Sequence, residues 1–234
     1  MKEFWGEFMG TAILVTLGCG VVAGVLLNKS KAQHAGWFVI CFGWGLAVML
    51  AIYAVGPLSG AHLNPAVSIA LALIGKLDMA FLPYYLAGQF LGAFTGAVIV
   101  YIHYLPHWKE TLDSEAKLSV FSTGPAINHT FSNFFSEFTG SFMLMLGLLF
   151  IGANKFSDGL NPFIICLLIV SIGLSLGGTT GWAINPARDL MPRLAHYLLP
   201  IQGKGSSNWQ YAWIPVLGPL VGCVAGALVF KAVF

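Results

Sequence analysis

Charged residues are scarce in this sequence. Only 9% of its 234 residues are Asp, Glu, Lys or Arg, 57% are hydrophobic, and the mean hydropathy is +0.81. Because a soluble domain has about 25% charged residues, this composition excludes one and places the chain in a membrane. The net charge of +2 leaves no basic face and no acidic tail, which excludes nucleic-acid partners.

Reactive and metal-binding patterns are also missing. The four cysteines, Cys19, Cys41, Cys166 and Cys223, all lie inside apolar runs, where a cysteine acts as a small hydrophobe rather than as a disulfide partner or ligand. His62 has no cysteine or carboxylate pattern near it, so we expect no metal site and no cofactor. No Ser/His/Asp, Cys/His or metal-spaced set points to an enzyme.

Long apolar runs fill most of the chain instead. A spanning helix needs about 20 mostly apolar residues, and six runs qualify: 4–27, 36–56, 81–104, 132–153, 161–180 and 209–232. Two further runs, 59–75 and 181–199, are too short and too broken by Gly and Pro to cross, and we interpret them as re-entrant half-helices. The sequence therefore predicts an all-α membrane protein with six transmembrane helices and two re-entrant half-helices.

The two halves of the chain resemble each other in sequence. Glu7-Phe8-Met9-Gly10-Thr11 matches Glu137-Phe138-Thr139-Gly140-Ser141 at an offset of 130, and Asn64-Pro65-Ala66 matches Asn185-Pro186-Ala187 at 121. We therefore divide one channel domain, 1–234, into repeats 1–104 and 132–234, joined by a polar linker, 105–131. Because each repeat has three spans, the second must be inverted, and the half-helices approach from opposite faces of the membrane.

Each half-helix begins with Asn-Pro-Ala. Proline fits the first turn of a helix, where its missing N–H would be unpaired anyway. Asparagine is a good N-cap, and its amide keeps donors for a passing solute. One such motif is explained as well by a plain helix cap. Two of them in inverted repeats predict two opposed, partially positive helix ends at the centre of a pore.

Glu7 and Glu137 lie deep in the first and fourth spans, where an unpaired charge is expensive. A proton-coupled role is one interpretation. We favour another, in which each accepts hydrogen bonds from its re-entrant loop, because no relay of titratable groups surrounds it. The stretches Gly60-Ala61-His62 and Gly181-Trp182-Ala183 precede the half-helices, and their carbonyls are then expected to form a ladder of acceptors along a water-filled path.

The segments His62-Leu63-Asn64-Pro65-Ala66-Val67 and Asn185-Pro186-Ala187-Arg188-Asp189, with the doubled Glu-Phe-x-Gly-Thr/Ser, resemble the aquaporin or major intrinsic protein family over essentially the whole chain. The resemblance implies a homotetramer with one pore per subunit and a selectivity filter of Trp44, Gly173, Trp182 and Arg188. Asp189 and the lack of a filter histidine are similar to the glycerol-conducting branch. They imply a passive channel for glycerol, other small neutral solutes and water that excludes ions and protons.

The filter residues suit that role. An intramembrane arginine is costly unless it faces water or a partner, so Arg188 is expected to donate to solute hydroxyls. Trp44 and Trp182 offer apolar faces to a carbon backbone, while Gly173 leaves room. Trp182 departs from the phenylalanine of the glycerol facilitators, and an indole that narrows the opening would give a water-selective aquaporin instead.

Two further expectations concern mechanism and location. A coupled secondary transporter also uses inverted repeats and broken helices, but it would need an ion site, and the sequence shows no carboxylate cluster for one. The short termini and the lack of a targeting segment lead us to expect a multi-pass protein of a bacterial plasma membrane.

Overall fold

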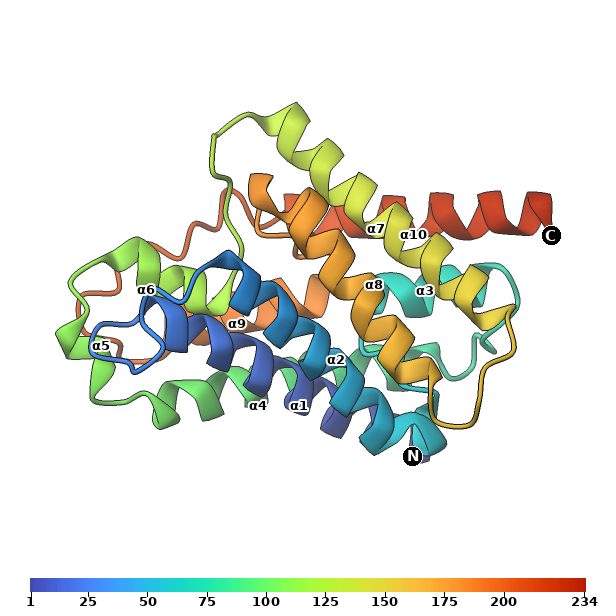
Figure 1. Ribbon diagram of the computed structural model, residues 1–234, viewed down its shortest axis with the longest axis horizontal. Helices are drawn as coiled ribbons and strands as arrows, with labels where there is room; N and C mark the ends of the chain where they lie inside the picture. Colours follow the sequence, from blue (N-terminus) through green and yellow to red (C-terminus); the bar gives the residue numbers. More distant parts are fainter.

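The computed structural model describes all 234 residues and contains helices without strands (Figure 1). In chain order the elements are α1 (Lys2–Leu26), α2 (Trp37–Ser59), α3 (Pro65–Leu73), α4 (Leu82–His103), α5 (His107–Glu110), α6 (Ser114–Phe121), α7 (Thr130–Gly152), α8 (Asn161–Leu176), the 3-10 turn η1 (Gly177–Thr179), α9 (Pro186–Leu198) and α10 (Ile214–Val233).

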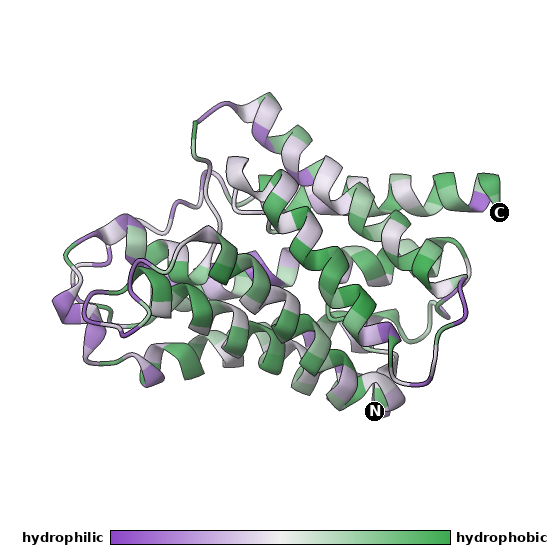
Figure 2. Cartoon of the chain, in the orientation of Figure 1, coloured by the Kyte–Doolittle hydropathy of each residue, from purple (hydrophilic) through white to green (hydrophobic).

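Six of these helices are long and apolar enough to cross a membrane: α1, α2, α4, α7, α8 with its η1 extension, and α10. They confirm the six predicted spans, and most hydrophilic residues lie in the connections at the helix ends (Figure 2). The last span begins at Ile214 rather than at residue 209, because Trp209 to Trp213 form turns. Pro215 then occupies the first turn of α10, where a proline costs no hydrogen bond.

The two half-helices are α3, with nine residues, and α9, with thirteen. At 1.5 Å per residue they are about 14 and 20 Å long, which is short of the roughly 30 Å of a hydrocarbon core. Figure 1 shows them in the middle of the molecule, with α3 toward the end that holds the C-terminus and α9 toward the other. They begin at Pro65 and Pro186, later than the predicted 59 and 181, because the five residues before each proline are not helical.

The spanning helices pack as two close pairs, α1 with α4 and α7 with α10. A Cβ at Gly92 would lie 2.3 Å from the carbonyl oxygen of Phe8, and one at Gly222 would lie 2.3 Å from that of Phe138. No side chain fits at either point, so the paired backbones touch, as small residues allow in membranes. Both half-helices pack against α4 and α10, one member of each pair.

The connection between the two halves is folded rather than a free linker. It contains α5 and α6, and it buries Trp108, Val120 and Phe121 in the hydrophobic core. Lys117 of α6 is also buried, and its ammonium donates to the carbonyl oxygens of residues 202 and 203 after α9. Burial lowers the pKa of that ammonium. Helix α6 also packs against both α1 and α9, so the connection holds a fixed position beside the second half-helix.

Candidate pore

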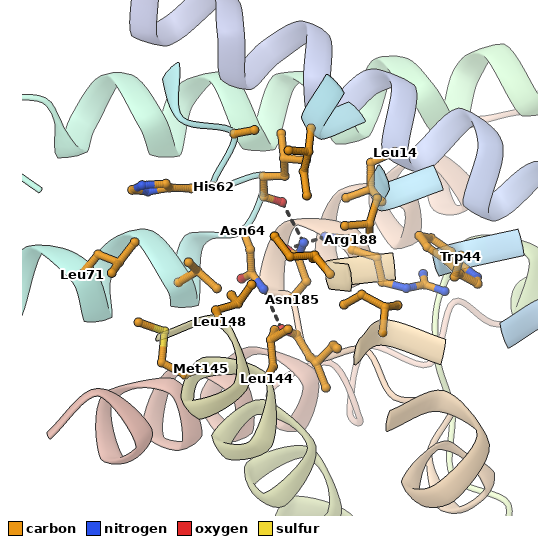
Figure 3. Close-up of a pocket in the computed structure, with 18 of the residues that line it drawn as sticks. Leu14, Trp44, His62, Asn64, Leu71, Leu144, Met145, Leu148, Asn185 and Arg188 are labelled. Carbon is orange, nitrogen blue, oxygen red and sulfur yellow. Dashed lines mark hydrogen bonds between the residues drawn. The ribbon is translucent and has the colours of Figure 1, made fainter. Parts of the chain in front are cut away.

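The two Asn-Pro-Ala motifs meet at the junction of α3 and α9 (Figure 3). Asn64 caps α3 by accepting from the Ala66 amide at 2.9 Å, and Asn185 caps α9 by accepting from the Ala187 amide at 3.1 Å. Each asparagine uses one donor to bridge to the opposite half, and Asn64 reaches the Ile184 carbonyl at 2.8 Å. Because a carboxamide nitrogen carries two hydrogens, each amide keeps one donor for a solute.

The loops that precede the half-helices have an unusual backbone. Ala61 and Leu63 have φ angles of 53° and 56°, and the corresponding residues of the second half, Trp182 and Ile184, have 38° and 43°. Such left-handed conformations cost non-glycine residues about 1–2 kcal/mol each. The surroundings must therefore hold both loops in place.

Two buried glutamates do so. Glu7 accepts from the amides of His62 at 2.9 Å and Leu63 at 2.6 Å. Glu137 accepts from the amides of Ala183 at 3.0 Å and Ile184 at 2.9 Å. Both carboxylates are fully buried, in α1 and α7.

The same contacts orient the loop carbonyls. In a trans peptide the C=O of one residue points opposite to the N–H of the next. Because the N–H groups point to the glutamates, the preceding carbonyls face away from them: those of Ala61 and His62 in the first loop, and those of Trp182 and Ala183 in the second. All four residues line one cavity, the inner cavity, which both motif asparagines also line. The Ala61 amide donates to Ser59 Oγ, which turns the Gly60 carbonyl similarly. Gly181 does not line this cavity but a second one, the outer cavity, which the loop after α6 also lines.

Three further polar residues complete this support. Ser59 donates to Glu7 at 2.7 Å, and Thr180 donates to Glu137 at 2.6 Å. Gln89 of α4 donates to both Glu7 and Ser68. None of these three residues was predicted from the sequence. The spacing of 121 between Ser59 and Thr180 equals that of the two Asn-Pro-Ala motifs and is the signal that would have found that pair.

Arg188 lies in the first turn of α9 and is 6% exposed. Its Nη1 donates to the Phe121 carbonyl at 3.2 Å, and its guanidinium carbon lies 4.0 Å from the Trp44 ring centroid. The face of the Trp44 ring stabilises the guanidinium through a cation–π interaction. The hydrogen bond to the Phe121 carbonyl fixes the position of the guanidinium. Figure 3 shows Trp44 and Arg188 together on one side of the asparagines, with His62 on the other.

The folded connection is bound to α9 beside this arginine. Asp189 accepts from the amide and hydroxyl of Thr123, both at 2.7 Å, and forms a fully buried ion pair with Arg193 at 2.7 Å. Arg193 also donates to the Thr123 carbonyl. From the sequence, Asp189 was only a marker of the glycerol-conducting branch and Arg193 had no predicted role, since a lone sequence does not show that the connection folds back onto α9.

Glycines shape the space around both tryptophans. A Cβ at Gly173 would lie 2.8 Å from Cζ2 of Trp182, and one at Gly177 would lie 2.6 Å from Cε3 of the same ring. A Cβ at Gly18 of α1 would lie 2.2 Å from Cζ3 of Trp44. Each indole therefore occupies a recess that only glycine provides. Gly18 and Gly177 were not found from the sequence.

Two cavities converge on these residues. The inner one has a volume of about 300 Å³ and is lined by both asparagines, the loop carbonyl residues and aliphatic side chains such as Leu144. The outer one, of about 360 Å³, is lined by the loop after α6 and by Trp37. The two cavities share three lining residues, Trp44, Trp182 and Arg188. Both motif asparagines and five of the six expected ladder residues line the inner cavity, and Gly181 lines the outer one. Gly173 lines neither cavity and instead lies against the Trp182 ring.

A family model, curated relatives and a solved structure all match this chain over nearly its whole length. The major intrinsic protein family model matches residues 1–230. A glycerol uptake facilitator protein of Bacillus subtilis is 60% identical over 100% of this chain and 85% of its own, and a probable one of Thermotoga maritima is 54% identical over the full length of both. The X-ray structure of the aquaglyceroporin from Plasmodium falciparum superimposes with a TM-score of 0.87 at 34% identity, over 99% of this chain and 96% of the other. The chain is therefore a multi-pass membrane protein of the major intrinsic protein family, a family of channels.

Proposed function

We propose that this chain is a glycerol uptake facilitator, a passive channel for glycerol and other small neutral solutes that also passes water. The observation that carries the proposal is the junction of the two cavities, where Arg188 and two indoles meet. A polyol presents hydroxyls on one side and carbons on the other, and this junction offers guanidinium donors and apolar indole rings next to each other. The relatives named glycerol uptake facilitator support the same assignment.

In this proposal Trp44, Gly173, Trp182 and Arg188 form the selectivity filter. Arg188 spends one donor on Phe121 and has others left for hydroxyls, because a guanidinium carries five. Trp44 and Trp182 bind the carbon side, and Gly173 makes room for the Trp182 ring. Along the inner cavity the loop carbonyls accept from the solute while aliphatic side chains face its carbons.

The midplane excludes ions. Each half-helix N-terminus carries about half a positive charge. At about 5 Å and an effective dielectric of about 20, the pair repels a unit cation by about 3 kcal/mol, and desolvation adds several kcal/mol. A water that accepts from Asn64 and Asn185 must point its protons away from the centre, which interrupts proton transfer along the file.

We further propose that 1–104 and 132–234 are inverted repeats. The left-handed residues, the loop amides that donate to the glutamates and the Ser59 and Thr180 donors recur at the offset of 121, and the glutamates themselves recur at 130. The two loops that precede the half-helices therefore have the same backbone conformation and the same supporting contacts. The family resemblance supports a homotetramer with one pore per subunit.

Stopped-flow light scattering on proteoliposomes tests the function. The native chain is expected to take up glycerol quickly with a weak temperature dependence, whereas Arg188→Ala is expected to lose discrimination against charged solutes. Fast water flow without glycerol uptake would contradict the proposal. If Trp182→Phe then restored glycerol uptake, the chain would be a water-selective channel narrowed by one indole.

A further inference from the structure

The outer cavity is lined by a third tryptophan, beside Trp44 and Trp182, that belongs to none of the proposed filter positions. Trp37 is the first residue of α2, two turns before Trp44 on the same helix. It lines the outer cavity together with Trp182 and Arg188 but does not line the inner one. Its side chain is therefore placed on the outer side of the constriction.

Trp37 contacts two of the filter residues directly. Its indole Nε1 donates to the Gly173 carbonyl at 3.2 Å. Its ring meets that of Trp182 at a centroid distance of 5.0 Å and an interplanar angle of 77°. This is the edge-to-face geometry that aromatic pairs prefer. The hydrogen bond fixes the Trp37 ring, and the ring contact transmits that position to Trp182.

The Trp182 side chain is enclosed from two directions. Gly173 and Gly177 bring the backbone of α8 and η1 against one side of its ring. A Cβ at Gly177 would lie 2.6 Å from Trp182 and 3.0 Å from Cζ2 of Trp37, so the two rings converge over this glycine. The indole cannot move toward the helix, and Trp37 blocks its movement outward.

We propose that Trp37 is a positioning residue that sets solute specificity by holding the Trp182 indole in the constriction. The inference rests on the proposed function of the pore. The Trp182 indole is larger than a phenylalanine ring, but it narrows the constriction only if its orientation is fixed. The contact with Trp37 fixes that orientation. Without Trp37 the indole can swing outward, and the constriction becomes wider and less selective.

The test compares uptake of water, glycerol and the four-carbon polyol erythritol in proteoliposomes. An aromatic pair contributes about 1 kcal/mol, which corresponds to about fivefold in a rate. We therefore expect Trp37→Ala to raise the erythritol-to-glycerol permeability ratio by about fivefold. Trp37→Phe keeps a ring but loses the donor to Gly173, and we expect a smaller rise. An unchanged ratio in a folded Trp37→Ala protein overturns the proposal.

The matched control is Phe38→Ala, because Phe38 follows Trp37 directly, is 61% exposed and stacks on Phe42 rather than on a filter residue. It is expected to keep the native ratio, and an equal rise in both alanine variants overturns the proposal. Trp37→Ala should add nothing to the ratio in a Trp182→Phe background, because the contact partner is already changed. Fully additive effects would show that Trp37 acts by another route.

Misfolding of a variant and failure of the proposed function can both be distinguished from failure of the Trp37 proposal. If Trp37→Ala does not assemble, as judged by size-exclusion chromatography, Trp37→Phe decides, and a native ratio in that variant overturns the proposal. If the native chain takes up no glycerol, the proposed function fails instead. Water permeability then tests Trp37, since it should rise in both Trp37 variants and stay native in Phe38→Ala.

Discussion

Asn64 and Asn185 exchange hydrogen bonds across the centre of the protein. The amide of Asn64 donates to the carbonyl of Ile184, the residue just before Asn185, and the amide of Asn185 donates to the carbonyl of Leu63, the residue just before Asn64. Both distances are 2.8 Å. The two half-helices are thus joined to each other by the same side chains that cap them.

This exchange predicts a stability cost for Asn185→Ala. The substitution removes the cap on the Ala187 amide and leaves the buried Leu63 carbonyl without its donor. A lost cap costs about 0.5–2 kcal/mol and an unpaired buried acceptor about 1–3 kcal/mol, so we expect a total loss of about 1.5–5 kcal/mol. Thermal unfolding in detergent measures the loss. Asn154→Ala is the control, since Asn154 is exposed and donates only within its own helix end, and equal losses in the two variants would contradict this explanation.

Glu137→Gln is expected to destabilise the second loop although it preserves side-chain volume. Glu137 accepts from Thr180, Ala183 and Ile184 and donates to none of them. A glutamine would turn an NH₂ group toward at least one of these donors. Because a hydrogen bond to a charged group contributes about 1.5–3 kcal/mol, we expect a loss of that size, measured by the unfolding midpoint in detergent. Ser136→Ala is the control, because Ser136 contacts Thr179 outside this cluster. Native stability in Glu137→Gln would show that the carboxylate is dispensable.

Asp189→Ala is expected to cost more than any change to a surface ion pair. It leaves the fully buried Arg193 guanidinium without its carboxylate and frees the Thr123 amide. Breaking a buried pair in this way costs about 3–5 kcal/mol. Lys29→Ala removes the exposed pair with Glu110 and is expected to leave stability near native. The unfolding midpoints of both variants in the same detergent measure the two stability losses. Losses of similar size would contradict the prediction.

The spans and the starts of the two half-helices were predictable because their signals are local. A run of apolar residues marks a span wherever it occurs, and Asn-Pro-Ala specifies a helix start by itself, so positions such as Asn64 and Asn185 could be assigned from one sequence. Glu7 and Glu137 were found through their repetition. The structure changed only the ends of these segments: non-helical loops replace the expected first turns of the half-helices, and the ends of the spans shift by a few residues.

The remaining parts depend on contacts between distant segments. The Phe121 carbonyl holds Arg188 from 67 residues away, and Trp37 reaches Gly173 from 136 residues away. A backbone carbonyl leaves no trace in the residue type that carries it. Gly177, likewise, is a glycine because a ring from another segment lies on it, and this depends on the folded position of Trp182.

The recess beneath Trp182 gives the last prediction, which concerns Gly177→Ala. The added Cβ would lie 2.6 Å from Cε3 and 3.1 Å from Cδ2 of Trp182, closer than nonbonded carbons approach. Gly177 itself is buried, whereas the Trp182 ring borders both cavities, so we expect the ring to move away from the helix toward the pore. We expect glycerol permeability to fall severalfold while water permeability falls less, because the narrower opening excludes the larger solute first.

The neighbouring glycine provides the control for that prediction. A Cβ at Gly178 would meet no atom within 4 Å, so Gly178→Ala introduces the same methyl group one residue away without touching the ring. It is expected to conduct like the native chain in the same stopped-flow measurement. A double variant, Gly177→Ala with Trp182→Phe, is expected to recover glycerol permeability because the smaller ring leaves space for the methyl group. If the double variant stayed impaired, the added methyl would be acting on the η1 backbone and not through the indole.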